Sequence, residues 1–337
     1  MVKEYLPRSR RRLGTGRRPL RVVDNVDIQV HAGESVALVG ESGAGKTTVA
    51  RMLSQLERPT SGRIWLGEEL LNHSRRKQLR DFRQRVQVIF QNPYESLDPR
   101  HSVQSAVIEP LNINRIGTRQ ERHDRVLEVL ELAGLTPAKR YLDRFPHELS
   151  GGQRQRVSIA RALAMSPSVL VADEPVSMLD ASVRSSILNL LTDLRSELGL
   201  ALLFVTHDLA TARHISDRLI IMYRGQVVES GPTDEIIARP AHPYTQMLLA
   251  AAGSRSIDHT DLVVDTRSPI LGACQFAPRC PLAKEVCWST SPPLEEVVVG
   301  RQAPATAQTQ RESRCLFALD VFTNSPMYSA AEEGDPH

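Results

Sequence analysis

A glycine-rich segment, residues 40–47, carries the first side chains whose types and spacing suit chemistry. It reads Gly-Glu-Ser-Gly-Ala-Gly-Lys-Thr and satisfies the pattern G-x-x-x-x-G-K-[ST] of a phosphate-binding loop, or P-loop. Its glycines let backbone N–H groups close around phosphate oxygens, and the helix that follows adds a favourable dipole. Lys46 can reach the β- and γ-phosphates of a nucleotide, and the Thr47 hydroxyl can ligate Mg²⁺. The candidate phosphate-binding residues are Gly40, Glu41, Ser42, Gly43, Ala44, Gly45, Lys46, Thr47 and Thr48.

Two adjacent carboxylates, Asp173 and Glu174, follow the apolar run at residues 169–172. A carboxylate at the carboxyl end of a buried strand lies beside the P-loop crevice in α/β sheets, where it can hold Mg²⁺ through water. Asp173 is the candidate for that role, and Glu174 can polarise the attacking water. Such a pair alone is commonplace as a solvated strand end, but with a P-loop in the same chain it indicates nucleotide hydrolysis.

A Ser-Gly-Gly-Gln turn, residues 150–153, precedes a helical stretch at residues 154–165. It forms a second helix N-terminus suited to an anion. One nucleotide does not readily need two separate phosphate cradles within one small domain. The turn therefore predicts two copies arranged head to tail, each placing its turn over the other copy's nucleotide. The alternative is that Ser150 only caps its own helix.

The elements that must position these residues are predicted from hydrophobic patterning. Apolar runs without polar alternation indicate strands buried on both faces, at residues 36–39, 86–90, 169–172, 201–205 and 219–223. Helical spacing lies between the runs, as at residues 183–198 after Asp180, which is an N-cap or a first-turn acid. This alternation predicts a mostly parallel α/β sheet. Residues 93–164 lack strand signals and carry helical patterns such as 119–133, so they predict an inserted helical subdomain.

Composition limits the class of protein. The 337 residues carry a net charge of +3 and are 41% hydrophobic but only 4% aromatic, so the core is mainly aliphatic. This excludes a disordered chain, a collagen-like chain and a disulfide miniprotein. No apolar run approaches the roughly 18 residues of a membrane-spanning helix. The basic N-terminus lacks the apolar stretch of a secretory signal, so we expect a cytosolic protein.

The four cysteines, Cys274, Cys280, Cys287 and Cys315, all lie in the last quarter of the chain. In a protein without a secretory signal, such clustering favours metal ligation over disulfides. The spacing C-x5-C-x6-C-x27-C contains no C-x2-C knuckle of the kind common in structural zinc sites. Four thiolates suit Zn²⁺ or an iron–sulfur cluster, and the wide loops suit the larger group better. Four reduced, buried thiols are the alternative.

Residues 20–237 resemble the ATP-binding cassette (ABC) ATPases. The family's motifs follow in order: Walker A at residues 40–47, the Q-loop at Gln91, the signature at 149–153, Walker B at 169–174, the D-loop at 177–180 and the switch His207. The resemblance implies that Thr47, Gln91 and Asp173 hold Mg²⁺, that Glu174 activates water, and that His207 contacts the γ-phosphate. It also implies that Ser150, Gly151, Gly152, Gln153 and Asp180 complete the nucleotide site of a second ATPase subunit.

An aromatic side chain that stacks on adenine is expected upstream of the P-loop in this family. Tyr5 is the only aromatic residue before Gly40, so it is the candidate. The alternative is that Tyr5 belongs to a frayed terminus. The Arg-rich run at residues 8–18 is interpreted as a solvated arm, and no nucleic acid is expected as a partner.

Several shorter sequence segments resemble one subgroup, the ATPase subunits of oligopeptide/dipeptide ABC importers. It is found at residues 90–93, 96–100, 173–177, 242–245 and in the tail Cys274-x-Phe276-x-x-Arg279-Cys280-Pro281. Met178 and Thr47 depart from the usual residues without removing a needed group. The resemblance implies an ATP-hydrolysing subunit at the cytoplasmic face of the membrane. Its partners are a second ATPase subunit, identical or not, two permease subunits and, indirectly, an extracellular binding protein. Members with this cysteine pattern carry a [4Fe–4S] cluster, which favours that group over Zn²⁺.

The expected fold is an α/β P-loop NTPase of ABC type over residues 1–237, with the helical subdomain at about 93–164. A small cysteine-containing domain is expected at residues 238–337. Two other functions are weighed against peptide import. One is an importer ATPase for nickel or another small solute. The other is a soluble ABC ATPase acting on nucleic acid or the ribosome, although such proteins have two cassettes or a long coiled-coil insertion, which this chain lacks.

Overall fold

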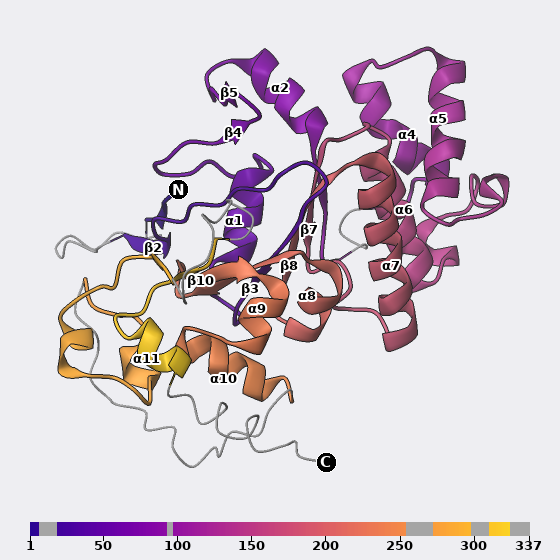
Figure 1. The fold of residues 1–337 in the computed structure, drawn as a ribbon. Coiled ribbons are helices and arrows are strands. Elements are labelled where there is room, and N and C mark those ends of the chain that lie inside the picture. The colour runs from indigo at the N-terminus through magenta and orange to yellow at the C-terminus, as the bar shows by residue number, and fades with distance from the viewer. Residues whose placement is uncertain (7–18, 93–96, 254–271, 298–309, 324–337) are drawn as a thin grey trace, which may run out of the picture. The chain divides into compact units, whose positions relative to one another are not determined.

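The computed structural model describes residues 1–6, 19–92, 97–253, 272–297 and 310–323 (Figure 1). The chain divides into two compact units, which are interleaved along the sequence. Unit 1 contains residues 1–3, 28–36 and 47–206, and unit 2 contains residues 4–27, 37–46 and 207–337. The Arg-rich run at 8–18 and residues 93–96 of the expected Q-loop segment lie outside the described residues.

Unit 1 contains three parallel strands, β6 (Val86–Ile89), β7 (Val169–Asp173) and β8 (Ala201–Thr206). Ile89 is opposite Ala172, and Asp173 is opposite Val205, so the three carboxyl ends lie at one edge. The parallel arrangement predicted for these runs is confirmed. It brings the residues that follow each strand to the same edge, where ligands bind in open α/β sheets.

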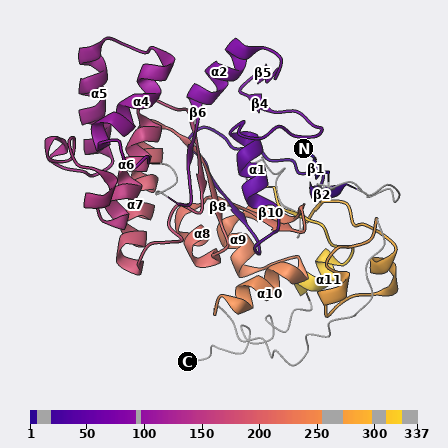
Figure 2. The ribbon, with the colours of Figure 1, turned by 180° about the vertical axis from the view of Figure 1, so that it is seen from behind.

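Most of the remaining elements of unit 1 are helices. The three helices α4 (Val103–Asn114), α5 (Arg119–Leu132) and α6 (Gly151–Leu163) lie together in both views (Figures 1 and 2). The described residues of the stretch 97–164 form helices and turns and contain no strand, as predicted. The other elements are α1 (Lys46–Leu53), β4 (Trp65–Leu66), β5 (Glu69–Leu70), α2 (Arg76–Arg85), η1 (Ala138–Arg140), η2 (Pro146–Glu148) and α7 (Ala181–Leu198).

Unit 2 contains antiparallel strands in the order β11-β12-β10-β9. They are β9 (Arg218–Tyr223), β10 (Gln226–Pro232), β11 (Glu295–Glu296) and β12 (Glu312–Ser313), and β3 (Ser35–Val39) follows β9 in the strand order. The expectation of a mostly parallel sheet is therefore wrong for this unit, and the whole sheet is mixed. The physical reason is the two-residue turn Arg224-Gly225, where φ values of 43° and 84° reverse the chain into a hairpin.

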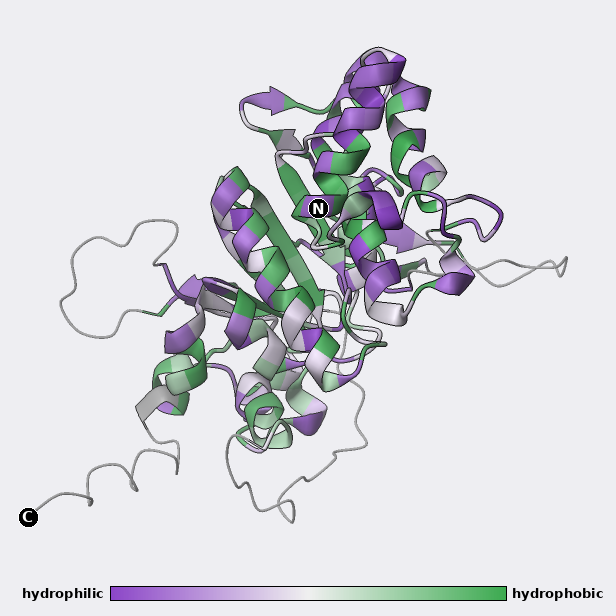
Figure 3. Ribbon diagram, turned by 90° about the vertical axis from the view of Figure 1, so that its right-hand side faces the viewer, coloured by the Kyte–Doolittle hydropathy of each residue, from purple (hydrophilic) through white to green (hydrophobic). Residues whose placement is uncertain are grey.

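The core of unit 2 joins β3 and β9 to the C-terminal segment. Tyr244 packs between Tyr223 and Phe276, with ring centroids 4.6 and 5.5 Å away. In Figure 3 the longer strands are coloured mainly hydrophobic, whereas the helices alternate between the two colours. The remaining elements are β1 (Lys3–Tyr5), β2 (Leu20–Val23), α8 (Leu209–Ile215), α9 (Thr233–Ala238), α10 (Pro243–Ala251), η4 (Ala277–Arg279), η5 (Glu285–Trp288) and α11 (Ala318–Thr323). Among the described residues, no helix combines the length and apolar character needed to cross a membrane.

Candidate nucleotide-binding site

The P-loop follows β3 and turns back on itself before α1. Its Ala44 N–H donates to the Glu41 carbonyl at 3.1 Å. Gly45 has φ of 101°, and a Cβ there would lie 2.7 Å from the Val22 carbonyl oxygen, so no larger residue fits. The Lys46 ammonium is buried against the loop and donates to the carbonyls of Gly40 (2.7 Å) and Glu41 (3.0 Å). The loop is thus tightly turned with Lys46 folded against it, and its binding of phosphate stays a prediction.

Thr47 and Asp173 meet in unit 1. The Thr47 Oγ1 donates to Asp173 Oδ1 at 3.2 Å, and Asp173 is 8% exposed at the end of β7. A hydroxyl and a carboxylate oxygen are hard ligands of the kind that Mg²⁺ takes in P-loop proteins. The donor set therefore fits the metal that the sequence predicts.

Gln91 and Glu174 also meet at this edge, because β6 and β7 are neighbours. Gln91 Nε2 donates to Glu174 Oε2 at 3.0 Å. Glu174 has φ of 47°, in the left-handed region that non-glycine residues seldom adopt, and its N–H donates to the Val205 carbonyl at 2.9 Å. Strained residues of this kind cluster at functional sites. Thr47, Gln91 and Asp173 line one cavity at this edge.

The signature turn caps helix α6. Ser150 accepts from the Gln153 N–H at 3.3 Å, and the Gln153 side chain accepts from the Ser150 N–H at 3.0 Å. These two bonds form a capping box. Within this chain, Ser150 therefore caps its own helix. Gly152 packs against α7, where a Cβ would lie 2.5 Å from Val183 Cγ1. Contact of Ser150, Gly151, Gly152 and Gln153 with a second subunit's nucleotide stays a prediction.

The other candidate residues are placed as follows. His207 is exposed directly after β8, and the Asp208 carboxylate caps α8 through the N–H groups of Ala210 (3.0 Å) and Thr211 (3.3 Å). Asp180 is the N-cap of α7, and the N–H of Val183 and the Ser182 hydroxyl, which hydrogen-bond its carboxylate, lower its pKa. Tyr5 ends strand β1, which pairs with β2, so it is not frayed. The nucleotide contacts of these three residues stay predictions.

Two side chains that contact the P-loop were not predicted to do so. The Arg279 guanidinium donates to both carboxylate oxygens of Glu41, each at 2.9 Å, and the Glu41 N–H donates to the Tyr244 hydroxyl at 3.0 Å. The Arg279 guanidinium lowers the pKa of Glu41. In the sequence, Arg279 and Tyr244 are only markers of a subgroup, and nothing local to either residue indicates a contact more than 200 positions away.

The four cysteines line one small cavity with His242 and Phe276. All four are free thiols. Burial raises the pKa of Cys280 to about 12 and that of Cys315 to about 11. Within the described part of the chain, no three His, Cys, Asp or Glu side chains are grouped so as to hold a metal ion. The thiols are therefore gathered in one place, but the arrangement does not itself form a metal site.

Comparison with known proteins gives two family matches. The family described as ABC transporter matches residues 23–177, and the family described as oligopeptide/dipeptide transporter, C-terminal region, matches residues 228–287. The chain is 43% identical over 300 residues to "Probable peptide ABC transporter ATP-binding protein y4tS" of Sinorhizobium fredii, covering 86% of this chain and 84% of that protein. It is 42% identical over 308 residues to the dipeptide transport ATP-binding protein DppF of Haemophilus influenzae, covering 89% and 93% of the two chains.

Solved structures agree with this relationship. One is a dimeric ATP-binding cassette in a post-hydrolysis state with ADP and Pi, which is 32% identical, has a TM-score of 0.59 and covers 69% of this chain and 96% of that chain. Another, part of an ABC transporter complex from Clostridium perfringens, is 30% identical, has a TM-score of 0.59 and covers 65% and 84% of the two chains. The chain therefore belongs to the ATP-binding proteins of ABC transporters, and it is an ATPase of the ABC type.

Proposed function

We propose that this ATPase powers the import of di- or oligopeptides through separate permease subunits. The observation that carries the proposal is the extent of similarity. Relatives named for peptide or dipeptide transport align over more than four fifths of the chain, and the peptide-transporter C-terminal region matches beyond the ATPase motifs. In this role the chain lies at the cytoplasmic face of the membrane, because its partners there hold the transport path.

The geometry supports a hydrolytic site of the following kind. Thr47, Gln91 and Asp173 offer oxygen ligands to Mg²⁺, which when bound neutralises charge on the β- and γ-phosphates. Glu174 accepts a proton from the attacking water, with its carboxylate held by Gln91. His207 donates to the γ-phosphate, and Lys46 with the loop N–H groups binds the phosphates. Tyr5 stacks on the adenine.

A second ATPase subunit, identical or different, completes each site. Ser150, Gly151, Gly152, Gln153 and Asp180 of one subunit contact the nucleotide bound to the other. The cassette with ADP and Pi to which this chain is similar is dimeric, which supports the arrangement. Closure of the two subunits drives the permeases to release substrate inward, and hydrolysis resets them.

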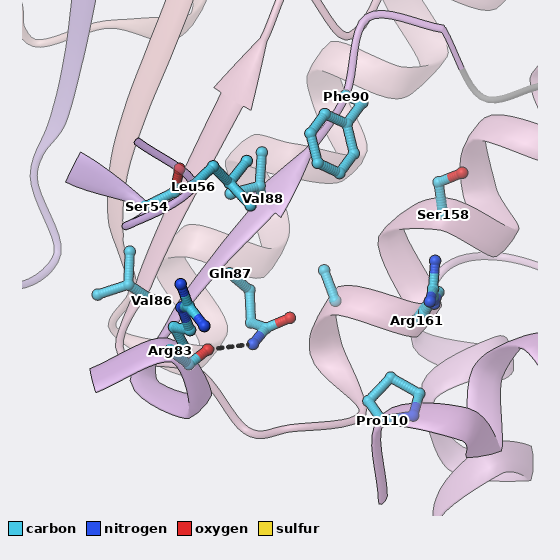
Figure 4. Close-up of a pocket in the computed structure, with 11 residues that line it drawn as sticks. Ser54, Leu56, Arg83, Val86, Gln87, Val88, Phe90, Pro110, Ser158 and Arg161 are labelled. Carbon is cyan, nitrogen blue, oxygen red and sulfur yellow. Dashed lines mark hydrogen bonds between the residues drawn. The ribbon is translucent and has the colours of Figure 1, made fainter. Parts of the chain in front are cut away.

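A cavity in unit 1 suits a permease segment (Figure 4). Its lining comes from β6 and from helices α2, α4 and α6. Phe90 is 39% exposed and Leu56 is 55% exposed, while Arg83 adds a guanidinium to the rim. These side chains favour a partner segment that presents an apolar side chain beside a carboxylate. Phe90 precedes Gln91, so an occupant of the cavity lies next to the candidate hydrolytic residues.

Charge reversal tests this docking surface. Arg83→Glu is expected to lower substrate-stimulated ATPase of the assembled transporter by about tenfold, because the cavity then repels an acidic segment. Arg85→Glu is the matched control, since Arg85 is also exposed, at the end of α2, but does not line the cavity. Equal activity of the two variants would reject the docking site.

Reconstitution tests the function itself. The chain is used to capture permeases from membranes, and the assembled complex is then assayed for ATPase with a binding protein and candidate di- and oligopeptides. Peptide-dependent stimulation is expected. Stimulation by nickel instead, or turnover that responds only to nucleic acid or ribosomes, would replace peptide import with one of those functions.

A second proposal concerns the cysteines. We propose that Cys274, Cys280, Cys287 and Cys315 hold a [4Fe–4S] cluster, with Zn²⁺ as the alternative. Four thiols and apolar walls around one cavity support it, since thiolates are the ligands of both groups. ATP hydrolysis requires no redox step, so the group is structural or regulatory. Iron, sulfide and visible absorbance in anaerobically purified protein are expected, whereas zinc alone or no metal would reject the cluster.

A further inference from the structure

We propose that Arg279 and Tyr244, from the C-terminal segment, are positioning residues of the P-loop, and that Arg279 neutralises the Glu41 carboxylate inside the phosphate-binding loop. This rests on the proposed nucleotide contacts of residues 40–47. It assigns the C-terminal segment a part in binding ATP in addition to any metal that its cysteines hold.

Glu41 creates an electrostatic difficulty for the loop. Its carboxylate belongs to a segment whose other groups, Lys46 and the backbone N–H groups, are suited to bind anions. A second negative charge beside the phosphates would repel them, because like charges a few ångströms apart interact strongly in partly buried surroundings. Glu41 therefore needs a compensating cation that does not itself compete with Lys46.

Arg279 meets that need with a two-point contact. Its two terminal nitrogens donate to the two oxygens of Glu41 at 2.9 Å each, the fork geometry that only arginine offers. The Arg279 and Glu41 side chains are 33% and 42% exposed, so the ion pair alone contributes little to stability. The ion pair instead fixes the position of the positive charge, because the Arg279 guanidinium also lies over the rings of Tyr223 (5.8 Å) and Phe276 (6.0 Å).

Tyr244 fixes the backbone of the same residue. Its side chain is fully buried between Tyr223 and Phe276, and its hydroxyl accepts from the Glu41 N–H at 3.0 Å. The Glu41 carbonyl accepts from Lys46 at 3.0 Å. Side chain, N–H and carbonyl of Glu41 are thus all bonded, which holds this loop residue in one orientation.

Nucleotide binding to the full chain tests the proposal, with ATP and ADP titrated in the presence of Mg²⁺. Arg279→Gln is expected to weaken ATP binding by roughly tenfold and ADP binding by less, because ATP carries more negative charge. Arg279→Lys is expected to fall between Arg279→Gln and the wild type. Tyr244→Phe, which removes only the hydroxyl, is expected to weaken both nucleotides by a similar smaller factor.

The double variant Glu41→Gln/Arg279→Gln separates charge compensation from general damage. It is expected to recover most of the lost ATP affinity, because the repelling carboxylate is gone. Lys284→Gln is the matched control, since Lys284 is a cation of the same segment that pairs with Asp320 at 3.8 Å instead. It is expected to leave both affinities unchanged.

Two results would overturn the proposal. One is wild-type affinity in Arg279→Gln, and the other is a double variant as weak as Arg279→Gln. Melting temperatures without nucleotide are measured in parallel, because a purely structural role lowers them without changing the ratio of ATP to ADP affinity. The wild-type chain is the reference throughout, and nucleotide binding is measured on the chain and not on the transporter. A transporter assay without peptide-stimulated turnover would therefore leave this result unaffected.

Discussion

Glu174 is held by its backbone as well as by its partner. Its φ of 47° and the bond from its N–H to Val205 fix the turn after β7, while Gln91 holds the carboxylate. Glu174→Gln keeps this geometry but removes the proton acceptor. ATP turnover of the assembled complex is therefore expected to fall by about 10²- to 10⁴-fold, with ATP still bound. Phosphate release is measured beside Glu197→Gln, an exposed position at the end of α7, and unchanged turnover in Glu174→Gln would remove this residue from the mechanism.

At the residue scale, the sequence predicts candidate site residues where the motif is local. The P-loop spans eight consecutive positions, and Asp173 is the last residue of its strand, so spacing along the chain identifies both as candidates. The pair of Arg279 and Glu41 could not be predicted this way. Its members are 238 positions apart, and one chain contains many arginines that could reach an exposed carboxylate.

At the scale of elements, the contact between α6 and α7 depends on one missing side chain. A Cβ on Gly152 would lie 2.5 Å from Val183 Cγ1, and a β-branched residue cannot rotate freely away. Gly152→Ala is therefore expected to lower the free energy of unfolding by about 1–3 kcal/mol, measured by urea denaturation. Gly151→Ala is the control, because its Cβ would meet only Leu179 at an ordinary 3.6 Å.

Shortening the Val183 side chain should relieve its clash with a Cβ at position 152 and restore the contact between α6 and α7. Gly152→Ala/Val183→Ala is expected to be less destabilised than the sum of the two single variants, which a double-mutant cycle measures. Additive losses would show that the clash is relieved by backbone movement and that Gly152 is not required by α7.

Elements were predictable where apolar residues are continuous. β7 and β8 are apolar runs buried along almost their whole length, and both were found. Strand β10 is not predicted because its sequence includes Glu229, Ser230 and Gly231, which are polar or small although all three are buried. Helix α2 was missed because Phe82 is its only buried residue, so it lacks an apolar stripe.

At the scale of the molecule, one buried ion pair joins distant parts of unit 2. Glu229 on β10 is fully buried and accepts from Arg311 at 3.0 Å and from the N–H groups of Ala241 (2.8 Å) and His242 (3.1 Å). It thereby ties the segment before β12 to the loop before α10. Burial raises the pKa of Glu229, and Arg311 opposes that rise. If Arg311 is lost, the stability of unit 2 therefore depends on pH through the titration of Glu229.

Arg311→Met leaves the Glu229 carboxylate buried without its cation and is expected to cost about 3–5 kcal/mol at neutral pH. The pKa of Glu229 in the folded variant then rises further above its ordinary value near 4.5. Because the folded state binds the proton more tightly than the unfolded state, the contribution of Glu229 to stability is fully present below about pH 4.5 and is lost as pH rises through the raised pKa. Denaturation curves between pH 4.5 and 8 measure this slope relative to wild type. Glu229→Gln/Arg311→Met has no carboxylate to titrate and should lose the additional pH dependence, whereas a slope retained in that double variant would assign the effect to another group.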